Sequence, residues 1–312
     1  MNKTDNRLIY IDIARLVAML WVVGWWHLIQ YTSADYTRYS FVGDEYVTVL
    51  MLSVFFFISG WMIGRKDFSS KAQIISFYKT RFLRFYILFA IAVFVYPIFG
   101  LNRSVTLLFT TLSATSSYIL PQPTTLWFLS MLASFYILTP YVKKSFYVRG
   151  GILLIIILLN ELLTSGVDQR LFIYFPVYVS GLYLSDKNIV ERVINSKVIG
   201  LLVLFMSIVL YIGTKYFVWL IFPFVFSGIL ALLFISRLLE NFVNERIIAP
   251  VIYSSLCAYL FHRPIYSGLR HIFGDVSIYT CLLLYLPICL VVSFYIQHLY
   301  DLILGKCKII RR

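Results

Sequence analysis

Residues 8–31 read LIYIDIARLVAMLWVVGWWHLIQY, an apolar run that indicates a membrane-spanning helix. A helix that crosses a bilayer needs about 20 consecutive, mostly apolar residues. The run exceeds the apolar region of a secretory signal peptide, and no small-residue cleavage site follows it. We therefore predict that the segment stays in the protein as its first membrane-spanning helix.

The composition of the whole chain is also typical of a membrane protein. Of its 312 residues, 61% are hydrophobic and 13% are charged, against about 45–50% and about 25% in soluble domains. No long stretch lacks an apolar run. We therefore expect residues 1–312 to form a single membrane domain, with no fused soluble domain.

Apolar segments of spanning length recur along the chain. Their number predicts an all-α, polytopic helix bundle with about ten transmembrane helices. Two of the segments are short enough to be tilted or partly embedded. The predicted spans lie near residues 9–30, 46–64, 82–100, 125–142, 151–165, 171–185, 197–214, 216–235, 249–267 and 278–304.

Positive charges predict the orientation of these spans. Lysine and arginine gather in alternate loops, as the positive-inside rule describes for loops that face the cytoplasm. The alternation supports ten spans better than nine or eleven, and it places both termini in the cytoplasm. The net charge of +13 then reflects orientation and contact with anionic lipid, and we expect no nucleic acid partner because no basic arm or recognition helix is present.

The four cysteines suggest no further site. Cys257, Cys281 and Cys289 fall in apolar segments, and Cys307 lies near the C-terminus. Their spacing is that of neither a metal site nor a redox pair. We expect no metal and no disulfide.

The first predicted span contains three residues that a bilayer disfavours. Each charge there costs about 2.5–3.5 kcal/mol on insertion scales. Asp12 and Arg15 lie three positions apart and could pair on one helix face near the cytoplasmic interface. His27 is a candidate general base, because histidine exchanges a proton near neutral pH. The alternative is a hydrogen-bonded interfacial histidine.

The next segments add small and basic residues. Ser59 and Gly60 interrupt a bulky aromatic run, and small residues let a helix or a ligand approach closely; helix packing is the commoner role. Lys79, Arg81 and Arg84 precede the third span. Arg81 and Arg84 lie one turn apart, where their guanidinium groups could grip phosphates, and ordinary anchoring at the inner surface is the alternative.

In this order, the segments resemble the membrane acyltransferase family 3, which includes the bacterial O-antigen and exopolysaccharide O-acetylases. The resemblance covers nearly the whole chain, and the order of its short motifs is its specific signal. The motifs are Ile11-Asp12-Ile13-Ala14-Arg15 through His27, Phe56-Phe57-Ile58-Ser59-Gly60, Arg81-Phe82-Leu83-Arg84, Leu126-Trp127-Phe128-Leu129 with Tyr136 and Pro140, Phe175 to Gly181, and Ser254 to His262.

Two features depart from the family pattern. Eleven residues separate Arg15 from His27 where the family usually has ten, which changes the angle between them around an α-helix from about 20° to about 120°. A π-bulge near Gly24 would restore the alignment. Many members also carry a glutamate shortly after the tryptophan motif, and residues 127–132 contain none.

The resemblance implies an O-acyltransferase in the cytoplasmic membrane of a bacterium. It would move an acetyl group from cytoplasmic acetyl-CoA to a hydroxyl of a cell-surface or lipid-linked saccharide. The implied roles are catalysis by His27 with Arg15, donor binding by Arg81, Arg84, Lys79 and Ser59, and acceptor contacts by Trp127, Tyr136 and His262. For the last three, aromatic packing and a structural hydrogen bond are the alternatives.

Two other functions fit the same composition. A transporter or flippase of a lipid-linked saccharide would use Arg15 and His27 to line a pathway, and broken helices or inverted repeats would favour it. A noncatalytic membrane subunit of a polysaccharide assembly complex would not bind coenzyme A. Acetyl and succinyl donors both stay open, and the sequence sets no oligomeric state.

Overall fold

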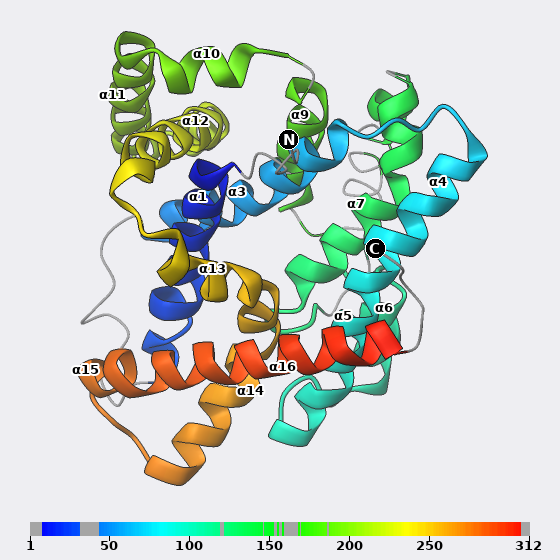
Figure 1. The fold of residues 1–312 in the computed structure, drawn as a ribbon, viewed down its shortest axis with the longest axis vertical. Helices are drawn as coiled ribbons and strands as arrows, with labels where there is room; N and C mark the ends of the chain where they lie inside the picture. The colour runs from blue at the N-terminus through cyan, green and yellow to red at the C-terminus, as the bar shows by residue number, and fades with distance from the viewer. Residues whose placement is uncertain are drawn as a thin grey trace, which may run out of the picture.

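The computed structural model describes residues 8–306 except 32–43, 119–121, 146, 153–154, 156–157, 159–167, 169 and 186. This part of the chain is all-helical (Figure 1). Its α-helices are α1 (Ile9–Trp21), α3 (Asp44–Gly64), α4 (Lys71–Phe77), α5 (Leu83–Val95), α6 (Val105–Leu112), α7 (Trp127–Lys144), α9 (Leu171–Leu184), α10 (Ile189–Asn195), α11 (Lys197–Thr214), α12 (Ile221–Leu239), α13 (Glu245–Tyr253), α14 (Ser255–Phe273), α15 (Ile278–Thr280) and α16 (Leu286–Lys306).

Short π and 3-10 turns extend or join several of these helices. The π turns are η1 (Val22–Trp26), η3 (Tyr78–Phe82) and η7 (Cys281–Tyr285). The 3-10 turns are η2 (Ile29–Tyr31), η4 (Tyr96–Phe99), η5 (Val218–Leu220) and η6 (Glu240–Phe242). Such turns let a long apolar segment stay helical while changing the direction of its side chains.

Length and composition allow several helices to cross a bilayer. Within the described residues, 6 helical stretches are long and apolar enough to do so, namely Ile9–Tyr31, Asp44–Gly64, Lys71–Phe99, Lys197–Thr214, Val218–Phe242 and Ile278–Gly305. The chain is therefore a multi-pass membrane protein. Ten spans and cytoplasmic termini stay predictions, and the predicted span over 151–165 lies largely outside the described residues.

The predicted span over 249–267 is not one continuous helix. α13 ends before Ser254, whose backbone angles of φ −94° and ψ 3° break the helix, and α14 begins at Ser255. The Ser254 hydroxyl donates to Pro250 O at 3.0 Å and the Ser255 hydroxyl to Ile252 O at 2.8 Å. Serine hydroxyls compete in this way with the backbone bonds of a helix.

Close packing joins α3 to α9. A Cβ atom added to Gly60 would lie 2.2 Å from Tyr178 O, and one added to Gly181 would lie 2.3 Å from Phe57 O. A Cβ on Gly64 would lie 2.3 Å from Ser185 Oγ. Gly60 thus has the packing role that its sequence context predicts, since small residues four apart let two helix backbones approach.

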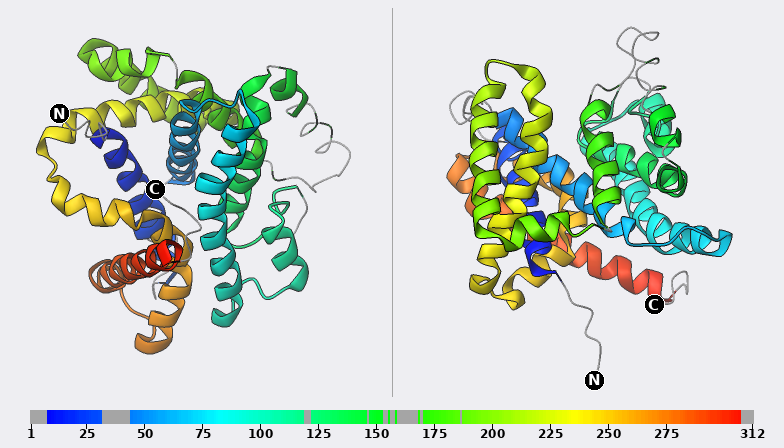
Figure 2. Two further views of the ribbon diagram at one scale, coloured as in Figure 1. Left: turned by 45° about the vertical axis from the view of Figure 1, so that its right-hand side comes forward. Right: turned by 90° about the horizontal axis from the view of Figure 1, so that it is seen from above.

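The pair α11 and α12 lies at one side of the bundle, away from α5 and α6 (Figures 1 and 2). Large apolar side chains of α11 face outward, among them Leu202 at 62% exposure and Phe205 at 67%. An apolar surface of this kind would be unfavourable in water. It is suited to contact with lipid tails.

Candidate active site

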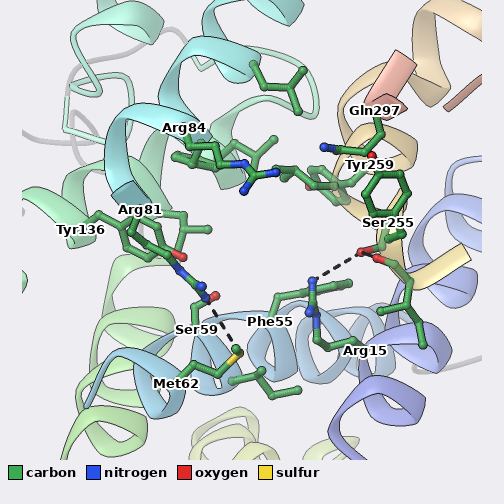
Figure 3. A pocket seen from close by; sticks show the side chains of 18 of the residues that line it. Arg15, Phe55, Ser59, Met62, Arg81, Arg84, Tyr136, Ser255, Tyr259 and Gln297 are labelled. Atoms are coloured by element: carbon green, nitrogen blue, oxygen red, sulfur yellow. Dashed lines mark hydrogen bonds between the residues drawn. The ribbon is translucent and has the colours of Figure 1, made fainter. Parts of the chain in front are cut away.

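A cavity of about 700 Å³ lies between α1, α3, η3, α5, α7, α13, α14 and α16. Its volume is within the range of about 300–1,000 Å³ that small-molecule sites occupy. The residues that line it include Arg15, Ser59, Arg81, Arg84 and Tyr136. The structure thus brings together residues that the sequence predicted for catalysis, for donor binding and for acceptor binding (Figure 3).

Two arginines enter the cavity from consecutive turns. Arg81 belongs to the π turn η3 and Arg84 to the first turn of α5. The Arg81 guanidinium lies 3.9 Å from Met62 Sδ. The Arg84 guanidinium forms an ion pair with Asp301 of α16, so the arginine that the sequence assigned to phosphate binding is already held by a carboxylate.

Asp301 is a site residue that the sequence analysis missed. Its carboxylate also accepts hydrogen bonds from the Tyr253 hydroxyl at 2.6 Å and from Gln297 Nε2 at 3.3 Å. A carboxylate within an otherwise apolar predicted span was the available signal, because such groups usually face a partner or a cavity.

Further positive charge lies next to Arg81. The pKa of Lys66 is lowered, first by burial and then by the charge of Arg81. The Lys143 ammonium donates hydrogen bonds to the backbone oxygens of Gly64 and Lys66. Lys79 is exposed and is not among the residues that line the cavity. Lys66 thus adds positive charge near Arg81, and Lys143 is bound to the backbone at Gly64 and Lys66.

Arg15 lies across the cavity from Arg81 (Figure 3). Its Nη2 atom lies 3.4 Å from Oγ of Ser255, which belongs to the motif Ser254 to His262 at the start of α14. Ser59 of α3 lines the cavity as well. Guanidinium groups from α1, η3 and α5 thus converge on one space, which would attract an anionic ligand from several sides.

The chain forms a π turn just before His27. η1 covers Val22–Trp26, and the His27 N–H donates to Val22 O at 3.0 Å, five residues back. A π-bulge is thus present at Gly24, where one would restore the alignment. One extra residue in the turn removes about 100° of helical rotation, which brings His27 back to about 20° from Arg15 around the axis.

His27 is buried, with 8% exposure, and it does not line the cavity. Its Nδ1 atom lies 2.7 Å from Nε2 of His262, which is fully buried. The His262 ring contacts the ring of Tyr259 at a centroid distance of 5.8 Å, and Tyr259 does line the cavity. The histidine pair therefore lies one layer behind the cavity wall.

Aromatic rings form this part of the wall. The Phe128 ring lies 6.0 Å from that of Phe55 and 5.0 Å from that of Tyr259, as centroid distances. All three residues line the cavity. Their rings close it on the side where Tyr259 meets His262.

Trp127 and Tyr136 do not form a shared wall for a sugar. Tyr136 lines the cavity, whereas Trp127 does not. The Arg170 guanidinium carbon lies 3.5 Å from the centroid of the Trp127 ring, and Arg170 is paired with Asp168. Nine positions along α7 separate the two residues by about 13.5 Å along the helix axis.

Comparison with known proteins identifies a family for this chain. A family model described as an acyltransferase domain matches residues 8–298. Comparison with curated proteins and with solved structures gave no match. The matched range contains the cavity-lining elements α1, α3, η3, α5, α7, α13 and α14 and much of α16.

Proposed function

The chain belongs to acyltransferase family 3 and is a membrane acyltransferase, and we propose on this basis that it transfers an acetyl group from acetyl-CoA to a saccharide hydroxyl. The cavity is the donor site in this proposal. Three guanidinium groups, those of Arg15, Arg81 and Arg84, face one space of about 700 Å³. The convergence of these three positive charges on one cavity is the main support for the proposal.

The donor would bind with its phosphates at the basic end of the cavity. Arg81 and Arg84 would hold phosphate oxygens, because the guanidinium fork matches them in geometry and charge. Lys66 adds positive charge near Arg81. The thioester end would then extend past Ser59, which lies beside Arg81, toward Arg15 across the cavity (Figure 3).

His27 would act as the general base on the acceptor. The saccharide hydroxyl oxygen forms a bond to the acetyl carbonyl carbon while its proton passes to the imidazole. The carbon–sulfur bond then breaks, the coenzyme A thiolate leaves, and the imidazole returns the proton to that sulfur. The products are an acetyl ester and free coenzyme A, and the base contributes about 10²–10⁴ in rate.

The reacting groups must meet near Tyr259. The donor cavity lies on one side of this ring and the histidine pair on the other. Displacement of the Tyr259 ring would let the acetyl carbonyl approach His27, and Arg15 would stabilise the oxyanion that forms. Membership of an acyltransferase family favours this reaction over the flippase alternative.

Mass spectrometry can test the proposal in cells and with purified protein. Surface polysaccharide from cells that lack the gene should be lighter by one acetyl group per modified sugar. The purified chain in nanodiscs should restore that mass when supplied with acetyl-CoA and the unmodified glycan. Equal masses with and without the gene would overturn the proposal, and so would movement of the glycan across the membrane without acetylation.

A further inference from the structure

We infer that His262 is a positioning residue that holds the proton of His27 on Nδ1 and leaves Nε2 of His27 as the basic atom. This inference rests on the proposed role of His27 as general base. It assigns to His262 a different task from the acceptor contact that its sequence context suggested.

Backbone carbonyl groups fix the tautomer of His262. Its Nδ1 atom lies 2.7 Å from Tyr259 O and 3.2 Å from Ala258 O. Carbonyl oxygens only accept hydrogen bonds, so Nδ1 must carry the hydrogen. A neutral imidazole has one N–H and one lone pair. Nε2 of neutral His262 is therefore an acceptor.

The acceptor at His262 Nε2 determines which ring nitrogen of His27 carries the hydrogen. Nδ1 of His27 lies 2.7 Å from that atom, so it must donate. The two rings are parallel within 8° with centroids 4.7 Å apart. Parallel rings stacked face to face could not bring two nitrogens to 2.7 Å, so the rings meet edge to edge, as a hydrogen bond requires.

Packing around α14 fixes the positions of both His262 and His27. His262 has no exposed surface, and the ring of Tyr266 lies 5.8 Å from its ring. The Tyr266 hydroxyl donates to Val23 O at 3.1 Å. One turn of α14 therefore holds His262 and also contacts the π turn that carries His27.

The arrangement follows the logic of a nucleophile, a base and a group that orients the base. A neutral histidine takes the place of the usual carboxylate here. When His27 accepts a proton at Nε2, its Nδ1–H continues to donate to His262, and that bond becomes charge-assisted and stronger. The stronger hydrogen bond stabilises the protonated form of His27, which is the form that a general base must reach during the reaction.

Three variants test the inference. His262→Phe removes the acceptor, and we expect it to lower kcat by up to about 10²-fold, the lower end of a general-base contribution, with KM for acetyl-CoA unchanged. His262→Gln keeps an acceptor oxygen and an N–H donor, and we expect it to recover most of that loss. His271→Phe is the matched control, since His271 is exposed on the same helix.

A spectroscopic readout separates positioning from mere packing. Nitrogen NMR of histidine-labelled protein in nanodiscs should place the proton of His27 on Nδ1 in the unmodified chain. In His262→Phe the proton should move to Nε2, the tautomer that free histidine favours.

A wild-type proton on Nε2, or a tautomer that ignores His262→Phe, would overturn the inference while the transferase activity stood. Full activity in His27→Ala would instead remove the proposed base and leave the tautomer result intact.

Discussion

The guanidinium group of Arg84 in α5, which lines the cavity, forms an ion pair with the carboxylate of Asp301 in α16. The two residues are 217 positions apart in the chain. The Tyr300 hydroxyl also donates to the backbone oxygen of Arg84. α16 therefore holds the arginine at two points, which orients it before any ligand enters.

We predict that Asp301→Asn tightens donor binding. The substitution keeps the shape of the side chain but removes the negative charge that offsets Arg84. The side chains are 38% and 21% exposed, and a pair of this exposure is worth up to about 1 kcal/mol. KM for acetyl-CoA should therefore fall by up to about fivefold, as measured by initial rates in nanodiscs. A rise in KM would mean that orientation by Asp301 matters more than its charge.

Arg81→Ala and Arg84→Ala should each weaken donor binding more than they slow the reaction. A hydrogen bond to a charged group is worth about 1.5–3 kcal/mol, so KM should rise by about 10- to 100-fold. Lys79→Ala should have a smaller effect, because Lys79 is exposed and outside the cavity. Lys71→Ala is the matched control for loss of one exposed positive charge.

Calorimetric titration with coenzyme A checks these variants without turnover. Affinities that stay unchanged in both arginine variants would place the phosphates elsewhere.

The π turn provides a test of helix register. Deleting Trp25 should convert η1 into an ordinary α turn and leave ten residues between Arg15 and His27. The alignment of the two side chains is then kept, and transfer should survive. Deleting Leu20 from regular α1 also leaves ten residues but disturbs the packing of Met19 and Val22 ahead of the π turn. Transfer activity should therefore be lower after deletion of Leu20 than after deletion of Trp25. Equal activity of the two variants would show that the π turn has no part in placing His27.

Gly60→Ala should destabilise the contact between α3 and α9. The new Cβ would lie 2.2 Å from Tyr178 O, so two helix backbones must separate. Overpacking of this kind costs about 1–3 kcal/mol. Thermal unfolding in detergent should show a lower Tm for this variant, whereas Gly305→Ala, where nothing lies within 4 Å, should unfold like the parent. Equal Tm values would indicate that α9 can move away freely.

Local patterns in the sequence predicted several parts of the site. The arginines lie one turn apart, so Arg81 and Arg84 were expected to share a ligand, and both line the cavity. The spacing of Arg15 and His27 sets the two side chains about 120° apart unless a π-bulge lies between them, and η1 is such a bulge. These predictions depend on residues close together in the chain, where helical geometry alone decides which side chains meet.

The long-range contacts could not be predicted in this way. His27 and His262 are 235 positions apart, and Arg84 and Asp301 are 217 apart. Which helix packs beside which depends on tertiary packing that one sequence does not reveal. The break at Ser254 was missed for a related reason, because serine hydroxyls within an apolar segment can either continue or interrupt a helix.

The most direct measurement is a cryo-electron microscopy structure of the chain in nanodiscs with a nonreactive thioether analogue of acetyl-CoA. We predict phosphate density between Arg81 and Arg84, with the acetyl end beside Arg15 and Tyr259 on the side of His27. Density for the analogue outside this cavity, or a His27 imidazole that faces lipid, would rule out the proposed mechanism.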